Sequence, residues 1–405
     1  MSLLYKPLEL IAAADLHALI DNQVGESLYI EYKVEVFDKR NDKKRIQFLG
    51  SVSAFANAAG GDILIGVKAD NGLPTELPGL DPGEVDSEVL RIRQLIGTSV
   101  EPNLLLHFHV VLLPTGRSIL IIRVPRSWTG PHGIEHNGHF QFFQRHAAGR
   151  TPMTLSELRT AFTFSESIVE RTRKFRDERL AAITAVEGPW GYLNKPLAVF
   201  QIVPFAGIAG AINIDFSNYA AFRKLSPLPA ERDGCIMQGD LRYNFDGVVM
   251  RQGIDWHTQL FRNGCVEYAT TAFFEQSMSP FYLDAWLYQI DVLRVLARFS
   301  ALNLTLGVAP PFMLLFSILN AAKFYLRTAE GWPINIGALS KHQIDRDRIF
   351  LPEVIWSDFS TDPIATLKPV FDCLWNSAGV KQCGFYRSNG TWIVDPSWLD
   401  PPNAY

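Results

Sequence analysis

A junction between a helix and a strand, from Ile46 to Ala69, constrains the fold of the first part of the chain more than any other stretch. The segment IQFLGSVSAFANAAGG has the apolar spacing of a helix and ends at Gly60 and Gly61, because glycine commonly terminates helices. DILIGVKA follows directly and is predicted to be a strand. Helices that alternate with strands in this way must pack on a sheet.

Another strand is predicted just before this helix, in the stretch ESLYIEYK that begins at Glu26. Apolar and polar residues alternate between Tyr29 and Phe37, which is the pattern of a half-buried strand. One face would carry Ile30, Tyr32, Val34 and Val36, and the other Glu31, Lys33 and Glu35. Glu31 and Lys33 therefore point the same way, either in an active site or on the polar face of an ordinary strand.

The rest of the first half continues this mixture of helices and strands. A turn at Asp70-Asn71-Gly72 precedes a helix near residues 83–96 and the predicted strands LLLHFHVVLL, SILIIRVP and HFQFFQRH. A short helix over residues 154–164 is followed by a strongly charged helix that reaches about residue 185. Charges of both signs are typical of a solvated connector, so we expect a domain boundary here.

The second half is predicted to be a separate domain, since 405 residues exceed what one hydrophobic core usually organises. Its patterns indicate several strands, a hairpin that turns at Arg262-Asn263-Gly264, and long helices over residues 282–303 and 311–326. The expected architecture is α+β, with an N-terminal mixed sheet and helices (1–165), a charged helical connector (166–189) and a second α+β domain with a hairpin-rich sheet and long helices (190–405).

Composition places the chain among ordinary folded proteins, because 47% of its residues are apolar and 20% are charged. A net charge of −4 argues against a protein that coats nucleic acid through a global positive field, although a local patch can still bind phosphate. The four cysteines show no CxxC spacing, so neither a zinc knuckle nor a disulfide framework is indicated. We expect no secretion signal and no transmembrane segment, and hence a cytoplasmic protein.

The pair Glu31 and Lys33 has the spacing that several metal-dependent nucleases use on a strand. The carboxylate would hold a divalent ion, and the lysine would steady the attacking water or a phosphate oxygen. Glu26 would join Glu31 if a turn folds it back, and Asp70 follows the second strand, so these acids could form a hard-cation site. The alternative is that Glu31 and Lys33 face solvent and that Asp70 only stabilises a turn.

Basic residues that could contact phosphate cluster after the first strand, at Lys39, Arg40, Lys43, Lys44 and Arg45. Arg145 lies in the strand HFQFFQRH, and Arg123, Arg126 and Arg150 are near it in the sequence. A nucleic-acid-binding protein needs such local cations for its phosphate contacts. The alternative is a solvated loop and ordinary surface charge.

Five stretches, taken in order, resemble the Schlafen AlbA_2 domain family. They are ESLYIEYK, SVSAFANAAGGDILIGVKADNG, SVEP, SILIIRVPRSWTGPH, and FQFFQRHAAGRTPMT with the helix after it. The resemblance covers about residues 20–165, and the block SAFANAAGGDILIGV is its most specific part. Residues 190–405 resemble no family.

The resemblance implies metal-dependent nuclease activity. Schlafen nucleases use a glutamate pair in the first motif and an aspartate after the GGDILIGV-type strand to bind Mg²⁺ or Mn²⁺, and they cleave tRNA or other structured or single-stranded nucleic acid. These roles correspond to Glu26, Glu31 and Asp70, while Lys33 matches the lysine that ends the first motif. Arg145 occupies the position of the basic residue in the last core strand of the family.

The sequence departs from the family pattern at one position of the proposed metal site. Lys68 and Ala69 stand where an acidic residue often follows the strand directly, so Asp62 and Glu35 are alternatives for the third ligand. The same domain also occurs in bacterial proteins described as DNA-binding regulators or ATP-binding proteins. ATP is not supported here, because the chain has no GxxxxGK[ST] motif.

The expected function is therefore that of a divalent-metal-dependent endoribonuclease, and bacterial antiphage defence would suit it. One alternative is a non-catalytic protein that binds nucleic acid and regulates transcription. Another is a component of a defence complex that works through protein contacts of residues 190–405, which we expect to sense, recruit or regulate, as a homo-oligomer or with a partner protein. RNA is favoured over DNA as the bound nucleic acid, and no membrane association is expected.

Overall fold

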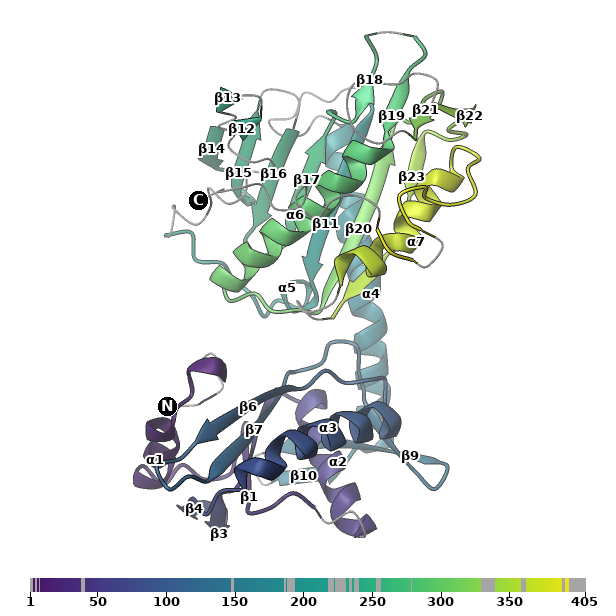
Figure 1. Ribbon diagram of the computed structural model, residues 1–405. Coiled ribbons are helices and arrows are strands. Elements are labelled where there is room, and N and C mark those ends of the chain that lie inside the picture. The colour runs from purple at the N-terminus through teal and green to yellow at the C-terminus, as the bar shows by residue number, and fades with distance from the viewer. Residues whose placement is uncertain are drawn as a thin grey trace. The chain divides into compact units, whose positions relative to one another are not determined.

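The computed structural model describes residues 3, 6, 8–37, 41–146, 149–185, 187, 194–217, 222, 231–232, 235–236, 240–252, 256–277, 279–328, 339–357, 362–387 and 390–392. The chain divides into two compact units, Met1–Ser167 and Ile168–Tyr405. Both units mix helices with sheets, which confirms the predicted α+β class (Figure 1). Among the described residues, no helix combines the length and the apolar character needed to cross a membrane.

The first unit is built on a four-stranded sheet in the order β1-β2-β7-β6, in which β1 and β2 are parallel and the other neighbours antiparallel. Its strands are β1 (Ile30–Lys33), β2 (Gly61–Ile65), β6 (His107–Leu112) and β7 (Ser118–Val124). A second sheet has the order β10-β9-β8-β5 and contains β5 (Val100–Glu101), β8 (Gly133–His136), β9 (His139–His146) and β10 (Gly149–Pro152). A separate hairpin pairs β3 (Lys68–Asp70) with β4 (Leu73–Glu76).

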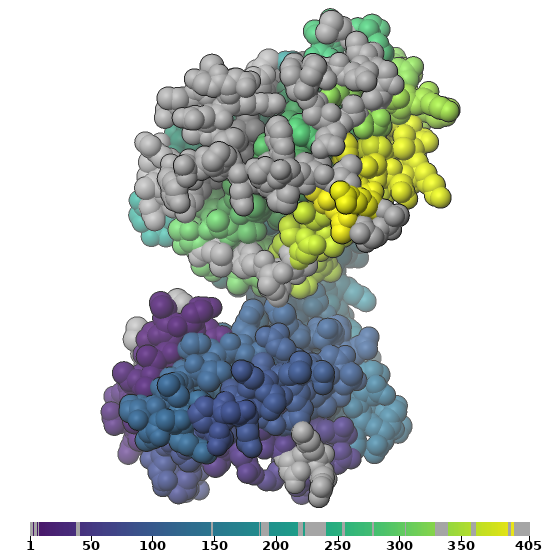
Figure 2. Space-filling model, in the orientation of Figure 1, coloured from purple at the N-terminus to yellow at the C-terminus, as the bar shows by residue number. Residues whose placement is uncertain are grey.

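Helices cover both faces of the first sheet. They are a short 3-10 helix (Leu8–Leu10), α1 (Ala13–Asp21), α2 (Asp42–Asn57) and α3 (Pro82–Ser99). Phe48 and Val52 of α2 share one core with Ile63 of β2 and with Phe143 of β9, so α2 lies between the two sheets. Side chains of α3, dark blue in Figure 2, form much of the face of this unit that is turned to the viewer.

The opposite face of the first sheet packs against α1, whose Leu16 shares a core with Ile30 and Tyr32. Strand β1 is therefore covered on both sides. Of the two alternatives left open for Glu31, a solvent-facing position is wrong, because Glu31 is only 9% exposed beneath α2. An alternation of apolar and polar residues cannot distinguish solvent from a buried polar contact.

The second unit contains a large antiparallel sheet in the order β14-β15-β16-β17-β11-β20-β23, with β24 also paired to β20. Its strands are β11 (Leu197–Pro204), β14 (Asp240–Tyr243), β15 (Gly247–Gln252), β16 (Trp256–Phe261), β17 (Val266–Thr270), β20 (Phe312–Leu319), β23 (Arg348–Phe350) and β24 (Val354–Trp356). Smaller sheets contain β12 (Glu231–Arg232), β13 (Cys235–Ile236), β18 (Phe274–Glu275), β19 (Tyr282–Asp284), β21 (Tyr325–Arg327) and β22 (Leu339–Gln343). The helices are α5 (Phe205–Ile208), α6 (Ala285–Thr305) and α7 (Pro363–Asn376), together with the second half of α4 (Leu155–Thr184).

Helices pack on both faces of this large sheet. Figure 1 shows α6 across the front of the sheet and α4 behind it. Phe299 of α6 and Phe371 of α7 belong to the large core on one face, while Leu180 and Ile183 of α4 pack on the other. The neighbouring inner strands β11 and β20 are consequently buried along their whole length.

Two predictions about the second half of the sequence have different outcomes. The hairpin predicted at Arg262-Asn263-Gly264 is confirmed, since β16 and β17 pair on either side of it. The helix predicted over residues 311–326 is wrong, because this segment contains strand β20. A fully buried strand between two neighbours is apolar on both faces, so its sequence lacks the alternation that identifies a half-buried strand.

A buried ionic cluster joins α4 to the large sheet of the second unit. Arg179 of α4 donates to both carboxylate oxygens of Glu267, at 3.0 and 3.2 Å, and Gln201 and His257 supply further contacts to this carboxylate. Burial raises the pKa of Glu267, but His257 and Arg179 outweigh it and lower the value to about 2. The charged helix that was predicted in two segments is thus one helix, and part of it packs on a core.

Candidate functional site

Glu31 lies at the centre of a polar site in the first unit. Ser51 of α2 donates to its Oε1 at 2.9 Å, and the Lys33 ammonium lies 2.7 Å from the same oxygen. The other oxygen is 2.5 Å from Nη1 of Arg145 on β9. Three elements, β1, α2 and β9, therefore converge on one carboxylate.

Arg145 also fixes the free edge of β1. Its Nε donates to the carbonyl of Ser27 at 2.8 Å and its Nη2 to that of Ile30 at 3.1 Å, while the guanidinium stacks on Phe55 at 4.1 Å. Only 4% of the Arg145 side chain is exposed. Because β1 is an edge strand, its outward carbonyls need donors from outside the sheet, and Arg145 provides them.

Glu26 folds back to the same edge of β1. Its Oε1 accepts a hydrogen bond from the backbone amide of Tyr32 at 2.9 Å, and its own amide donates to the carbonyl of Gly72 at 2.7 Å. Glu26 thus contacts the backbone next to Glu31 and connects β1 to the turn between β3 and β4. In this position the carboxylate replaces the partner that an edge strand lacks.

Asp70 is carried on the β3–β4 hairpin, outside the four-stranded sheet. DILIGVKA, predicted as one strand, is interrupted because Gly66 has a φ of +99°, so β2 ends at Ile65 and β3 begins at Lys68. Asp70 is exposed at the end of β3. Within the described residues, no group of three or more His, Cys, Asp or Glu side chains comes together in a way that could hold a metal ion.

The two alternative ligands have other partners. Asp62 is 1% exposed and forms an ion pair with Arg123, whose Nε lies 2.8 Å from Oδ1. Its neighbours in register place it on the face of the sheet opposite to Glu31. Glu35 pairs at the surface with Lys44 at 3.1 Å.

The electrostatics of the site keep Glu31 ionised. Burial alone would raise the pKa of this carboxyl, but the charges of Lys33 and Arg145 and the hydrogen bond from Ser51 outweigh it and hold the pKa below the ordinary value of 4.5. At neutral pH the carboxylate therefore carries a full negative charge and neutralises one of the cations around it.

A further cation, Arg150, lies beside this group. It is directly opposite Arg145 in the β9–β10 pair, so both side chains project toward α2. Arg150 donates to the carbonyl of Gln47 and stacks on Phe143 at 4.9 Å. Burial and the charge of Arg145 lower the pKa of Arg150, while the charge of Glu31 raises it. Lys33 and Arg145 thus contact Glu31 directly, and Arg150 lies opposite Arg145 on the neighbouring strand.

The basic run after β1 is only partly available for phosphate contacts. Lys39 and Arg40 lie outside the described residues. In the first turn of α2, Lys44 pairs with Glu35 and Arg45 with Asp42. Lys43 is exposed, and no ion pair with a described residue involves it. The N-terminus of α2 adds a partial positive charge to this surface.

Sequence reasoning missed Ser51. A signal was present, because a serine stands on a helical segment between Phe48 and Phe55, which are both buried. A polar residue within an apolar helix face indicates a buried partner. The partner itself, Glu31, is 20 residues away in sequence, so pairing the two requires the three-dimensional fold.

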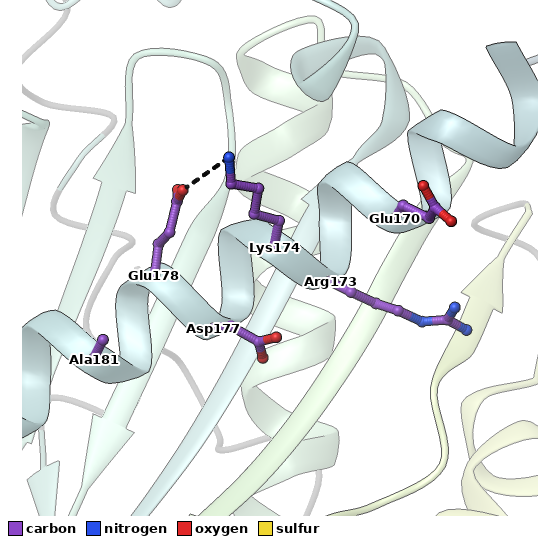
Figure 3. A pocket seen from close by; sticks show the side chains of 6 residues that line it. All are labelled: Glu170, Arg173, Lys174, Asp177, Glu178 and Ala181. Carbon is purple, nitrogen blue, oxygen red and sulfur yellow. Dashed lines mark ion pairs between the residues drawn. The ribbon is translucent and has the colours of Figure 1, made fainter.

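A surface hollow on α4 in the second unit has a different character. Figure 3 shows six residues of one helix face, including the ion pair between Lys174 and Glu178 at 3.6 Å. Glu170 and Asp177 add negative charge, and Arg173 reaches Glu353. Acids outnumber bases here, so this surface does not select anions.

One family profile matches residues of the first unit. Residues 26–154, about a third of the chain, match the profile of the family described as Schlafen, AlbA_2, which confirms the resemblance found in the sequence. No curated protein matches the chain.

Two solved structures show only slight likeness. One is the N-terminal domain of a protein from Nitrosomonas europaea described as related to the ATP-dependent DNA helicase RecG, with 24% identity, 34% of this chain and 89% of that chain covered, and a TM-score of 0.26. The other is the DIP2311 protein from Corynebacterium diphtheriae, with 15% identity, 35% and 29% covered, and a TM-score of 0.24. Scores this low carry no argument about fold or function.

Proposed function

We propose that the first unit, whose residues 26–154 match the Schlafen AlbA_2 profile, binds nucleic acid through phosphate contacts around Glu31. The observation that carries this proposal is the excess of basic over acidic side chains at the site. Lys33 and Arg145 contact one carboxylate and Arg150 lies opposite Arg145, which leaves a local excess of positive charge in a chain whose net charge is −4.

The exposure of the cations decides which of them would contact phosphate. Arg145 is buried and already bonded to Glu31 and to β1, so it organises the site. Lys33 is 27% exposed and Arg150 is partly exposed, so both can donate to an incoming phosphate oxygen. Such contacts fix a strand in place without reading its sequence.

The test is the equilibrium binding of fluorescent oligonucleotides, measured by anisotropy over a series of salt concentrations. We compare single-stranded RNA, single-stranded DNA and duplex RNA with the full-length protein. Lys33→Gln and Arg150→Gln should weaken binding to every sequence and lower the salt slope by about 0.7 for each lost phosphate contact. The matched control is Lys68→Gln, which removes a lysine that pairs with Glu76 on β3.

Two results would count against the proposal in different ways. If the wild type binds but Lys33→Gln and Arg150→Gln behave like Lys68→Gln, nucleic acid binds elsewhere. If the wild type binds none of the three probes at low salt, the first unit is not a nucleic-acid-binding module.

Metal-dependent cleavage of RNA is the second candidate function, and it rests on the family match and on the ionised Glu31. Mg²⁺ or Mn²⁺ would supply charge stabilisation at a phosphate. In the arrangement described above, Glu26, Glu31 and Asp70 do not form a set of ligands, since Glu31 is bonded to cations and Glu26 to a backbone amide. The geometry therefore supports binding better than cleavage.

Cleavage is tested by incubating tRNA and single-stranded RNA with Mg²⁺ or Mn²⁺. Glu26→Gln and Asp70→Asn are suitable variants because both positions are exposed and the amides preserve shape. Both should abolish cleavage, whereas Glu35→Gln should not. Equal cleavage by all four proteins, or none by the wild type, would remove this candidate while leaving the binding proposal intact.

The wider role that we propose from the family resemblance is antiphage defence, in which the second unit senses, recruits or regulates. A plaque assay of cells that express the full chain tests this role. Plaque numbers should fall with the wild type and recover with Arg150→Gln. Plaque numbers that are unchanged by the wild type would argue instead for a regulatory nucleic-acid-binding protein.

A further inference from the structure

A cleft of about 330 Å³ lies on the other face of the β8–β9–β10 sheet, away from Glu31. It is formed by the loop from Arg126 to Pro131, by Gln144 of β9 and by the first half of α4. Gln144 and Arg145 are adjacent in β9 and so project to opposite faces, one into the cleft and one toward Glu31. The cleft is thus separate from the Glu31 site, although both belong to the first unit. Its volume suits one small planar ligand.

The cleft presents a cation on an aromatic ring. The guanidinium carbon of Arg126 lies 4.1 Å from the centre of the Trp128 ring, and both residues line the cleft. Within the described part of the chain, Arg126 forms no ion pair with a carboxylate, although it is exposed. A guanidinium over an indole face has donors at its edge that can bind an anion.

An aromatic ring of α4, Phe164, also lines the cleft. Phe164 is 37% exposed, and its ring centre lies 6.2 Å from that of Trp128, with the planes inclined at 38°. Trp128 itself is only 8% exposed, so Phe164 is the more accessible of the two rings. A flat ring that enters the cleft would therefore stack on Phe164 beside the Arg126 cation.

Hydrogen bonds hold the walls in place before any ligand enters. Asn57 accepts from the amide of His132 at 2.7 Å and donates to the carbonyls of His132 and Phe143, both at 2.9 Å. The amide of Ser127 donates to the carbonyl of Ala56 at 2.8 Å. These bonds attach the loop to α2, so a ligand would not have to order it.

We propose that this cleft takes one nucleotide unit, with the base stacked on Phe164 beside Trp128 and the phosphate bound by Arg126. The nucleotide can belong to a single strand that is also held at the Glu31 site, and in that case the inference rests on the proposed function. A free 5′-mononucleotide carries the same base and phosphate groups and is the other ligand that the cleft could bind. Duplexes are excluded, because a paired base cannot present its face to a ring.

The test measures the binding of single-stranded oligonucleotides and of the four 5′-mononucleotides to the full-length protein. The variants are Phe164→Leu, which keeps an apolar side chain but removes the ring, and Arg126→Gln. Each has a matched control. Phe162→Leu changes a ring that is 46% exposed on the same helix but outside the cleft, and Arg93→Gln changes an arginine stacked on Phe108 at 4.7 Å.

Phe164→Leu should weaken oligonucleotide binding by about 5-fold or more, since stacking one base on an aromatic ring contributes at least that much. Arg126→Gln should weaken binding to all sequences and lower the salt slope by about 0.7. Both controls should match the wild type. If only mononucleotide binding depends on Phe164 and Arg126, the nucleotide is a free ligand and not part of a strand.

Equal affinities of both cleft variants and their controls, for strands and for mononucleotides, would overturn the inference. In that case the wild type would still bind strands through Lys33 and Arg150, so the proposed function would survive. If Lys33→Gln and Arg150→Gln bind strands as the wild type does, while mononucleotide binding depends on Phe164 and Arg126, the proposed function fails and the inference about the cleft stands. The two claims therefore fail separately.

Discussion

Replacing Glu31 by glutamine should destabilise the first unit strongly. The change removes the charge that compensates Lys33 and Arg145, and the Arg145 side chain is only 4% exposed. Removing one partner of a buried ion pair costs about 3–5 kcal/mol, because the other charge stays buried and uncompensated. Glutamine still accepts from Ser51, and Arg145 keeps its bonds to two carbonyls. We therefore expect the free energy of unfolding of the first unit to fall by about 3 kcal/mol, the lower end of this range.

Native-state hydrogen exchange, read by mass spectrometry, is the suitable assay. The chain folds as two units, so a single melting temperature does not report the free energy of unfolding of the first unit alone. Peptides from α2 and β2 should lose protection in Glu31→Gln, while peptides from β16 and β17 should not. Glu35→Gln is the matched control, because it breaks an exposed ion pair in the same stretch and should cost less than about 1 kcal/mol.

The effect of Glu31→Gln should also depend on pH. The folded pKa of Glu31 lies below 4.5, so its contribution to stability is fully present above that pH and is lost as the pH falls through the folded pKa. The difference between wild type and variant should shrink below pH 4.5. A difference that equals that of Glu35→Gln at neutral pH, or that does not change on acidification, would refute the ionic account of the site.

Four other substitutions test contacts within each unit by chemical denaturation and hydrogen exchange. Glu267→Ala should lower the free energy of unfolding of the second unit by about 3–5 kcal/mol, because Arg179 would remain buried without its carboxylate; an effect below 1 kcal/mol would contradict this. Gly66→Ala should destabilise the first unit by at least about 1 kcal/mol, since φ is +99° there, and a neutral result would argue against the break between β2 and β3. Asn57→Asp should destabilise more than Asn57→Ala, because a carboxylate would face the carbonyl of His132; the opposite order would refute the proposed hydrogen bonds.

Local sequence patterns predicted those helices and strands that have one apolar face and one polar face, and the turns between them. The hairpin at Arg262-Asn263-Gly264 has a strong turn signal, and α2 ends at Asn57, three residues before the glycines that were predicted to stop it. The strand β20 was missed because its eight residues are all buried, so the sequence shows an apolar run without a period. The continuity of α4 was missed because its charged face suggested a connector, while its contacts with Glu267 depend on residues far away in sequence.

The same limit applies to the site. Alternation placed Glu31 and Lys33 on one side of a strand, and in the structure their charged groups are in contact. It could not show that α2 covers this side, nor that Arg145 crosses to it from β9, 114 residues away. Contacts of this kind are set by how the elements pack, and a single sequence carries little information about packing.

We propose above that nucleic acid contacts the cationic group around Glu31. Hydrogen exchange of the full-length protein, with and without a saturating single-stranded oligonucleotide, tests it without any substitution. We predict added protection in peptides that cover β1, the first turns of α2, and β9 with β10, and none in those that cover β14 to β16. Protection confined to the second unit, or no change anywhere under conditions where binding is independently measured, would contradict the claim.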